Sequence, residues 1–205
     1  MKTKVLLVIV LASLLSVNTV FADSPLTSTE FYKAYAQNAI IKKTIQARGQ
    51  LTPELVAYLT NSSNPIALKM AVINGLGWNY KEKNNASIFL HYLIQKKEFG
   101  NETDFRNRAN GQQLICYAYL KALDNYFDVN VALQLANLPQ LKTEKSLTIQ
   151  LIRGLIQAQQ NLSKSPCAIY TEMHKIQLDK SLKQDLNATA LKIIFEYIGL
   201  YKKGC

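Results

Sequence analysis

Cysteine, glycine and proline are all scarce in this sequence, and their scarcity excludes several classes of protein. The chain of 205 residues contains three Cys, eight Gly and five Pro. Three cysteines are too few for a disulfide-dense scaffold, and the low glycine and proline content excludes collagen-like and low-complexity chains. Because hydrophobic residues make up 48% of the chain, it can bury a sizeable core, which argues against disorder.

Motifs that mark catalytic, cofactor and metal sites are also missing. The sequence has no Gly-x-Ser-x-Gly element, P-loop or glycine-rich dinucleotide fingerprint. Its two histidines, His91 and His174, belong to no metal-binding spacing. His91 with Cys116 is the least implausible catalytic pair, but the apolar neighbours of Cys116 favour a buried, inert thiol. We therefore predict a protein that is not an enzyme and has no catalytic residue, metal site or cofactor.

Acidic residues are outnumbered, since 14 Asp and Glu stand against 24 Lys and Arg, which gives a net charge of +10. Loss of residues 1–22 would remove two lysines and no acid, leaving 22 basic and 14 acidic residues and a net charge of +8. Such a charge favours anionic surfaces, but it does not indicate a specific nucleic-acid partner.

The N-terminus is typical of a secretory signal peptide. Lys2 and Lys4 precede an apolar run over residues 5–15, and a small residue, Ala22, follows a few positions later. We predict cleavage after Ala22, with residues 23–205 forming a single all-helical domain in the periplasm or outside the cell. A transmembrane anchor is the alternative, although this apolar stretch is marginal in length for one. No later segment is long and apolar enough to span a bilayer.

Helical periodicity runs through the rest of the chain, and no stretch shows a convincing strand alternation. Thr27 and Glu30 fit a capping box, and N-cap residues precede proline at 52–53, 64–65 and 165–166. We predict nine helices over about 27–48, 52–60, 64–79, 85–97, 108–126, 129–137, 143–160, 166–178 and 184–202.

The connections between these predicted helices are mostly short, so consecutive helices should pack as antiparallel neighbours. Pro139 should break the chain before a new cap at Thr143. The one longer gap, from Glu98 to Arg106, is polar and is expected to form a mobile surface loop.

One helix carries a repeat-like pattern over residues 64–77. After Asn64-Pro65, the run places Lys69 in a basic position, Ala71 and Gly75 in small positions, and Leu-Gly at the end. This pattern resembles the second helix of a HEAT repeat, and weaker matches begin at Ile115 and Leu147. The resemblance implies an all-α fold, an α-solenoid of about four antiparallel hairpins with an N-terminal capping helix. An irregular helical bundle is the alternative, and a tetratricopeptide-like pairing also stays open.

The cysteines suggest one crosslink. Cys167 opens one predicted helix and Cys205 ends the chain after the next, so an antiparallel pair would bring them toward each other, and we name this pair as a possible disulfide. A free or intermolecular thiol at Cys205 is the alternative.

Five Asn-x-Ser/Thr sequences also occur, at Asn61, Asn85, Asn101, Asn161 and Asn187. They are either glycan acceptors of a secreted protein or polar turns and caps.

These features favour a non-enzymatic helical-repeat protein that binds another protein or peptide along a groove formed by the second helices. Tyr117, Lys121, Arg106 and Arg108 are the candidate partner-binding residues, because exposed aromatic and basic side chains anchor interfaces. One specific version is an inhibitor or immunity-type protein that neutralises an envelope toxin or hydrolase. The other alternative is a basic protein that binds the envelope surface.

Overall fold

Every regular element that the structure describes is helical. The computed structural model describes residues 24–78, 83–162 and 165–205, and the predicted signal segment 1–22 lies outside them. The all-α fold class is therefore confirmed. The elements, in chain order, are η1 (Phe31–Tyr35, a 3-10 helix), α2 (Ala39–Gln46), α3 (Pro53–Thr60), α4 (Ile66–Leu76), α5 (Asn85–Gln95), α6 (Glu102–Arg108), α7 (Gly111–Asp124), α8 (Asn130–Ala136), α9 (Pro139–Lys142), α10 (Leu147–Asn161), α11 (Pro166–Leu178), α12 (Ala188–Ile198) and η2 (Gly199–Gly204, a 3-10 helix).

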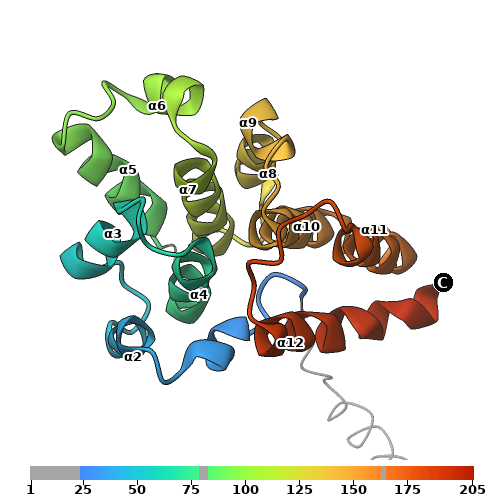
Figure 1. The fold of residues 1–205 in the computed structure, drawn as a ribbon. Coiled ribbons are helices and arrows are strands. Elements are labelled where there is room, and N and C mark those ends of the chain that lie inside the picture. Colours follow the sequence, from blue (N-terminus) through green and yellow to red (C-terminus); the bar gives the residue numbers. More distant parts are fainter. Residues whose placement is uncertain (1–23, 79–82, 163–164) are drawn as a thin grey trace, which may run out of the picture.

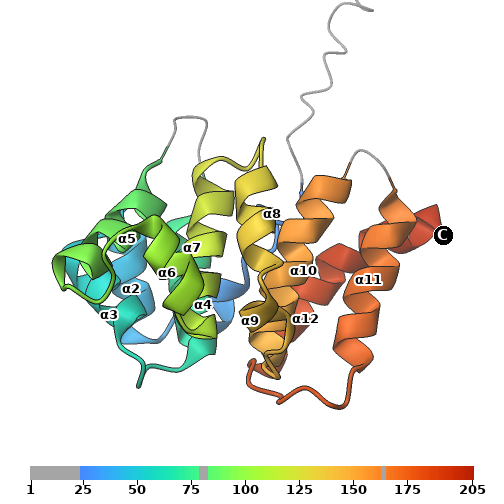
Figure 2. The same cartoon turned by 90° about the horizontal axis from the view of Figure 1, so that it is seen from above.

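Three helices, α4, α7 and α10, pack against one another at the centre of the molecule (Figure 1). They are flanked by α3 and α5 on one side and by α8 and α11 on the other (Figure 2). The succession of packed pairs agrees with a short solenoid of hairpins. The last helix, α12, runs across this stack and contacts η1, which agrees equally with an irregular bundle.

The central helices α4 and α7 are apolar on most sides, whereas α10 is amphipathic and buries its apolar face. In α4, nine of 11 residues are buried, and in α7 ten of 14 are buried. Small residues at the repeat positions permit close approach: a Cβ at Gly154 of α10 would lie 2.6 Å from the Met173 sulfur of α11. The sides of these helices are consequently core surfaces.

Residues 24–35, which we call the N-terminal segment, pack against one side of α4. Leu26 and Phe31 of this segment are fully buried. Asn74 of α4 fastens it, because its amide nitrogen donates to the Thr29 carbonyl and its Oδ1 accepts from the Tyr32 amide, both at 3.0 Å. The same amide nitrogen donates to the Tyr119 hydroxyl of α7 at 3.0 Å. The groove that we expected along the second helices is thus filled here by the chain itself.

The predicted helix over 27–48 is wrong as a single element. The chain forms η1, turns at residues 36–38 and begins α2, where the Asn38 side chain accepts a hydrogen bond from the Ile40 amide at 3.0 Å. Thr27 is not the N-cap of this element: its hydroxyl lies 2.8 Å from Ser24 Oγ in a preceding turn, and Glu30 is the residue before η1. Asn38 is a strong N-cap inside the apolar pattern, and it divides the helix.

The segment 98–106 is not the mobile loop that its polarity suggested, because it contains the start of α6. Asn101 caps this helix by accepting from the Asp104 amide at 2.9 Å. Phe99 and Phe105 are buried in edge-to-face contact, with ring centroids 5.1 Å apart. Two aromatic anchors suffice to hold a helix whose outer face is charged.

Two further boundaries differ from the prediction. Pro139 begins the short helix α9, in agreement with the preference of proline for a first helical turn, and Thr143 lies at its C-terminal end. Ser146 is the residue that caps α10, accepting from the Ile149 amide at 3.1 Å. The last predicted helix starts at 188 instead of 184, because residues 179–187 form an irregular connection.

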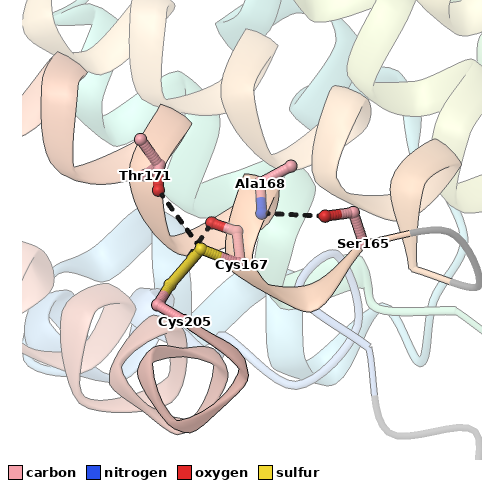
Figure 3. Close-up of a disulfide and its surroundings, with 5 residues drawn as sticks. All are labelled: Ser165, Cys167, Ala168, Thr171 and Cys205. Carbon is pink, nitrogen blue, oxygen red and sulfur yellow. Dashed lines mark hydrogen bonds between the residues drawn. A yellow bond between two sulfur atoms is a disulfide. The ribbon is translucent and has the colours of Figure 1, made fainter.

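The C-terminal hairpin is closed by a disulfide between Cys167, in the first turn of α11, and Cys205 (Figure 3). Their Cα atoms lie 4.7 Å apart, and this is the pair that the sequence analysis named. Ser165 orients Cys167 by capping α11, since its hydroxyl accepts from the Ala168 amide at 3.2 Å. The 3-10 helix η2 packs on α11 and brings the end of the chain back to the start of that helix.

Candidate functional site

Two of the candidate partner-binding residues, Tyr117 and Lys121 of α7, border an apolar depression between α5, α6 and α7. The depression has a volume of about 460 Å³, and His91 and Glu102 also line it. Tyr117 is only 1% exposed and packs edge-to-face on Phe105 at 5.3 Å. The Lys121 ammonium lies 5.5 Å from the centre of the Tyr117 ring and covers it. Tyr117 is therefore a core side chain whose edge reaches a surface depression.

The two candidate arginines are already paired within α6. Arg106 Nη2 donates to Glu102 Oε1 at 2.7 Å, and Arg108 Nη2 donates to Asp104 Oδ2 at 2.7 Å. The Arg108 guanidinium lowers the pKa of Asp104 to about 2. Arg108 also donates to the Glu98 carbonyl at 2.8 Å, so it stabilises the corner between α5 and α6. The structure brings Tyr117 and Lys121 together and leaves Arg108 outside their depression.

A larger concavity opens at the N-terminal ends of α4, α7 and α10, and we call it the polar groove. Its larger lobe, of about 600 Å³, is lined by the connections that enter these helices, at residues 62–64, 110–112 and 144–146, and by Lys183 and Asp185. Its smaller lobe, of about 390 Å³, shares Ser62, Asn110 and Gln112 with the larger one. These connections lie along the lower edge of the molecule in Figure 2.

The helix ends around the polar groove are organised by side chains that satisfy their first amide groups. Asn110 and Gln113 form a capping box on α7. At α10, Asp185 Oδ1 accepts from the Thr148 amide at 2.9 Å and from its hydroxyl at 2.8 Å. By contrast, α4 begins after Pro65, which has no side-chain acceptor. The amide ends of three neighbouring helices thus face one concavity, and two of them are capped by polar side chains.

The Glu144 carboxylate lies against Gly111 in the first turn of α7. A Cβ atom at Gly111 would overlap with this carboxylate, so a larger residue there would require the Glu144 side chain to shift. A carboxylate at a helix N-terminus is favourable because it opposes the positive end of the helix dipole. The polar groove therefore contains an acidic side chain of its own beside the cationic Lys145 and Lys183.

Lys69 is the most unusual residue of the polar groove. Its side chain projects from the apolar helix α4, is only 2% exposed, and lines the smaller lobe. The Lys69 ammonium donates to Gln112 Oε1 at 2.8 Å. Burial lowers the pKa of Lys69, because the charged form has lost solvent. Among the described residues, no carboxylate forms an ion pair with it.

The Cys116 and His174 side chains are buried or packed against neighbouring residues. Burial raises the pKa of Cys116 to about 12, so this thiol is protonated and unreactive at neutral pH. His174 Nδ1 lies 3.0 Å from Gln177 Oε1, and the His174 ring stacks on Tyr170. His91 borders the apolar depression, whereas Cys116 is completely buried. In residues 24–78, 83–162 and 165–205, no three His, Cys, Asp or Glu side chains form a group suited to a metal ion.

One Asn-x-Ser/Thr sequence has a clear structural role. Asn85 is 2% exposed, accepts from the Leu51 amide at 2.9 Å and donates to the Gly49 carbonyl at 2.9 Å. Asn101 and Asn187 cap α6 and α12 at the surface. These asparagines fit the interpretation as helix caps and buried bridges.

The polar groove was not predicted from the sequence, in which Lys69 was interpreted only as the basic position of a repeat helix. The signal that could have indicated Lys69 is a single charged residue within the apolar run of α4.

None of the helices in the described part of the chain has the length and apolar character needed to cross a membrane. Comparison with protein-family models, with curated proteins and with solved structures finds no match to this chain.

Proposed function

We propose that this chain is a non-enzymatic helical-repeat protein that binds a protein or peptide partner in the polar groove. The observation that carries the proposal is the position of the groove, at the ends of the three core helices and on the connections that enter them. Binding residues in proteins are concentrated on loops that a rigid scaffold holds in place. The buried trio α4, α7 and α10 provides such a scaffold.

The lining of the polar groove favours a polypeptide over a flat ring-shaped ligand. Among the described residues, no aromatic side chain lines either lobe, so these residues offer no surface for stacking a sugar or a nucleobase. Its walls instead carry hydroxyl and amide side chains that donate and accept hydrogen bonds, among them Ser62, Asn64, Asn110 and Gln112. The main chain of an extended peptide presents the complementary amides and carbonyls at regular intervals.

The proposed site of action is the periplasm or the outside of the cell, with residues 1–22 acting as a signal peptide. The disulfide between Cys167 and Cys205 supports an oxidising compartment. An inhibitor or immunity-type role is one form of this proposal, in which the partner is an enzyme that loses activity when the groove engages it.

The test is site-specific photo-crosslinking in the producing cell envelope, using the full chain so that processing proceeds normally. A photoreactive residue at exposed Ser63, which lines the larger lobe, is compared with one at exposed Lys192 on α12. We expect one stoichiometric protein partner to be crosslinked from Ser63, at both low and high salt, and not from Lys192.

Two outcomes contradict the proposal. Identical crosslinked species from both positions would mean that the groove has no special role. Capture of anionic polymers alone, lost at high salt, would indicate a basic envelope-surface binder, since exposed electrostatic contacts are screened by salt.

A further inference from the structure

Lys69 lies in an environment that a purely structural lysine does not need. It belongs to α4, in which nine of 11 residues are buried, and only 2% of its surface is exposed. Removing an ammonium from water is costly unless a counter-ion or several acceptors replace the solvent. The structure gives its three N–H groups one acceptor, the neutral Gln112 Oε1 at 2.8 Å.

Lys83 shows what a satisfied lysine looks like in the same molecule. Its ammonium donates to the Leu76 carbonyl at 2.8 Å and to the Gly77 carbonyl at 2.7 Å, which closes the C-terminal end of α4. The carboxylate of Asp124 lies close enough to favour its charge. Lys69 has no equivalent set of partners among the described residues, although both lysines have lost solvent.

The smaller lobe of the polar groove gives Lys69 access to a ligand. This lobe holds about 390 Å³, enough for a carboxylate and the atoms next to it. Of the described residues that line it, Glu98 alone carries a carboxylate, and Glu98 Oε2 already accepts from Gln113 Nε2 at 3.1 Å. The remaining lining side chains are neutral hydroxyls and amides. The lobe is thus polar and concave, and it contains a buried cation.

We propose that the smaller lobe binds a carboxylate of an acidic peptide segment, with the Lys69 ammonium as its counter-ion and neighbouring amide groups as further donors. This inference rests on the proposed function, because the carboxylate belongs to the partner in the polar groove. A carboxylate supplies the acceptors that Lys69 lacks, and charge-assisted hydrogen bonds are about twice as strong as neutral ones. The carboxylate can come from an Asp or Glu side chain or from a chain terminus.

The first test is the stability of Lys69→Met, which keeps the side-chain length and removes the charge. If Lys69 is retained for binding, the variant should be more stable than the wild type, since buried unpaired charges lower stability. We expect Tm to rise by about 2–4 °C or more. An unchanged or lower Tm would mean that Lys69 stabilises the fold and would overturn the inference.

The second test is an NMR titration of the processed full chain with three probes. Acetyl-Gly-Gly-Glu-Gly-Gly-amide carries a side-chain carboxylate, acetyl-Gly-Gly-Gly carries only a terminal carboxylate, and acetyl-Gly-Gly-Gln-Gly-Gly-amide carries none. At least one carboxylate probe should shift the signals of the Lys69 ammonium and the Gln112 amide at millimolar concentration. Which of the two carboxylate probes binds identifies the source of the carboxylate.

Matched variants complete the titration. Lys69→Met should lower the affinity for the carboxylate probe by about tenfold or more, because it removes a desolvated charge partner. Lys192→Met removes the same charge from the exposed face of α12 and should change nothing. Equal shifts with the Gln probe, unchanged binding to Lys69→Met, or no shift with either carboxylate would each refute the inference.

These results separate the inference from the proposed function. A partner crosslinked from Ser63 with equal yield in wild type and Lys69→Met would keep the polar groove as a binding site and reject its carboxylate specificity. A carboxylate site in the titration, without any crosslinked partner, would keep the carboxylate site of the smaller lobe and reject the proposed protein partner.

Discussion

The polar groove and the apolar depression are the two concave surfaces best placed to receive a partner, and they are built in opposite ways. The depression lies along the sides of α5 and α7, and its floor includes the core residue Tyr117. The groove lies at helix ends, and most of its lining comes from connections. Packing therefore controls the residues of the depression, whereas the groove can present polar groups with little effect on the core.

The difference teaches where to look for function in a helical stack. Tyr117 and Lys121 of α7 lie at helical spacing, but both make their contacts within the molecule: Tyr117 packs on Phe105, and Lys121 covers the Tyr117 ring. The ends of the core helices keep their polar character because their first amide groups need acceptors. The end of such a stack offers directed hydrogen-bonding groups that its sides do not.

The largest effect that separates the two surfaces is expected for Tyr117→Ala. If Tyr117 is a core residue, its truncation should lower the free energy of unfolding by about 3–5 kcal/mol. Urea denaturation of this variant and of Lys121→Met, which should change stability by less than about 0.5 kcal/mol, measures the contrast. A Tyr117→Ala protein as stable as the wild type would show that the depression is an open binding surface.

Asn74→Ala tests whether the N-terminal segment is fastened to α4. Asn74 makes two hydrogen bonds to this segment, one to the Thr29 carbonyl and one from the Tyr32 amide, and a third to the Tyr119 hydroxyl of α7. Its loss should cost about 2–3 kcal/mol. Hydrogen exchange should speed up first in residues 24–35. Uniform acceleration over the whole chain would contradict a local fastening role.

Glu144→Gln should raise the affinity of the polar groove for acidic ligands. The Glu144 carboxylate lies in the first turn of α7, where it competes electrostatically with an incoming carboxylate. Neutralising it should raise the affinity for an acidic peptide a few-fold, at a cost in stability of about 0.3–1 kcal/mol. Calorimetric titration measures the first quantity and thermal melting the second. Unchanged affinity would place the carboxylate of the ligand away from Glu144.

The smallest expected effect is a pH dependence of folding stability that arises from Lys69. Because burial lowers its pKa below 10.5, the unfolded chain binds more protons than the folded chain between the two values. Stability from this group therefore rises with pH over that interval. The advantage of Lys69→Met over wild type should shrink as the pH approaches about 10. Cys116, the nearest titrating neighbour, stays protonated there, since its pKa is about 12.

Local signals predicted much of the fold. Thr52-Pro53 and Ser165-Pro166 cap α3 and α11 as expected, because both the acceptor and the fixed proline φ act within one turn. The prediction was wrong at 27–48, where Asn38 starts a second helix, and at 98–106, where two buried aromatic residues hold a short helix. At 98–106 tertiary contacts outweighed the local pattern, whereas at 27–48 a second local signal, the Asn38 cap, divided the predicted helix.

The polar groove could not have been predicted from the same signals. It requires residues 62–64, 110–112, 144–146 and 183–185 to meet, and nothing in their local sequence shows that the four connections lie at one end of the molecule. Lys69 alone left a trace, as a charge within an apolar run. The sequence could indicate that this lysine is unusual, but the missing partners are visible only in three dimensions.

The construction of the groove from separate connections has a consequence for how its specificity can change. Substitutions and short insertions in the four connections alter the shape and hydrogen-bonding pattern of the walls, and surface loops tolerate such changes at small thermodynamic cost. Lys69 belongs to the core helix α4, where neighbouring side chains constrain its position. Engineered variants that differ only in these connections could therefore bind different partners. All of them would keep Lys69, and with it the proposed preference for a carboxylate.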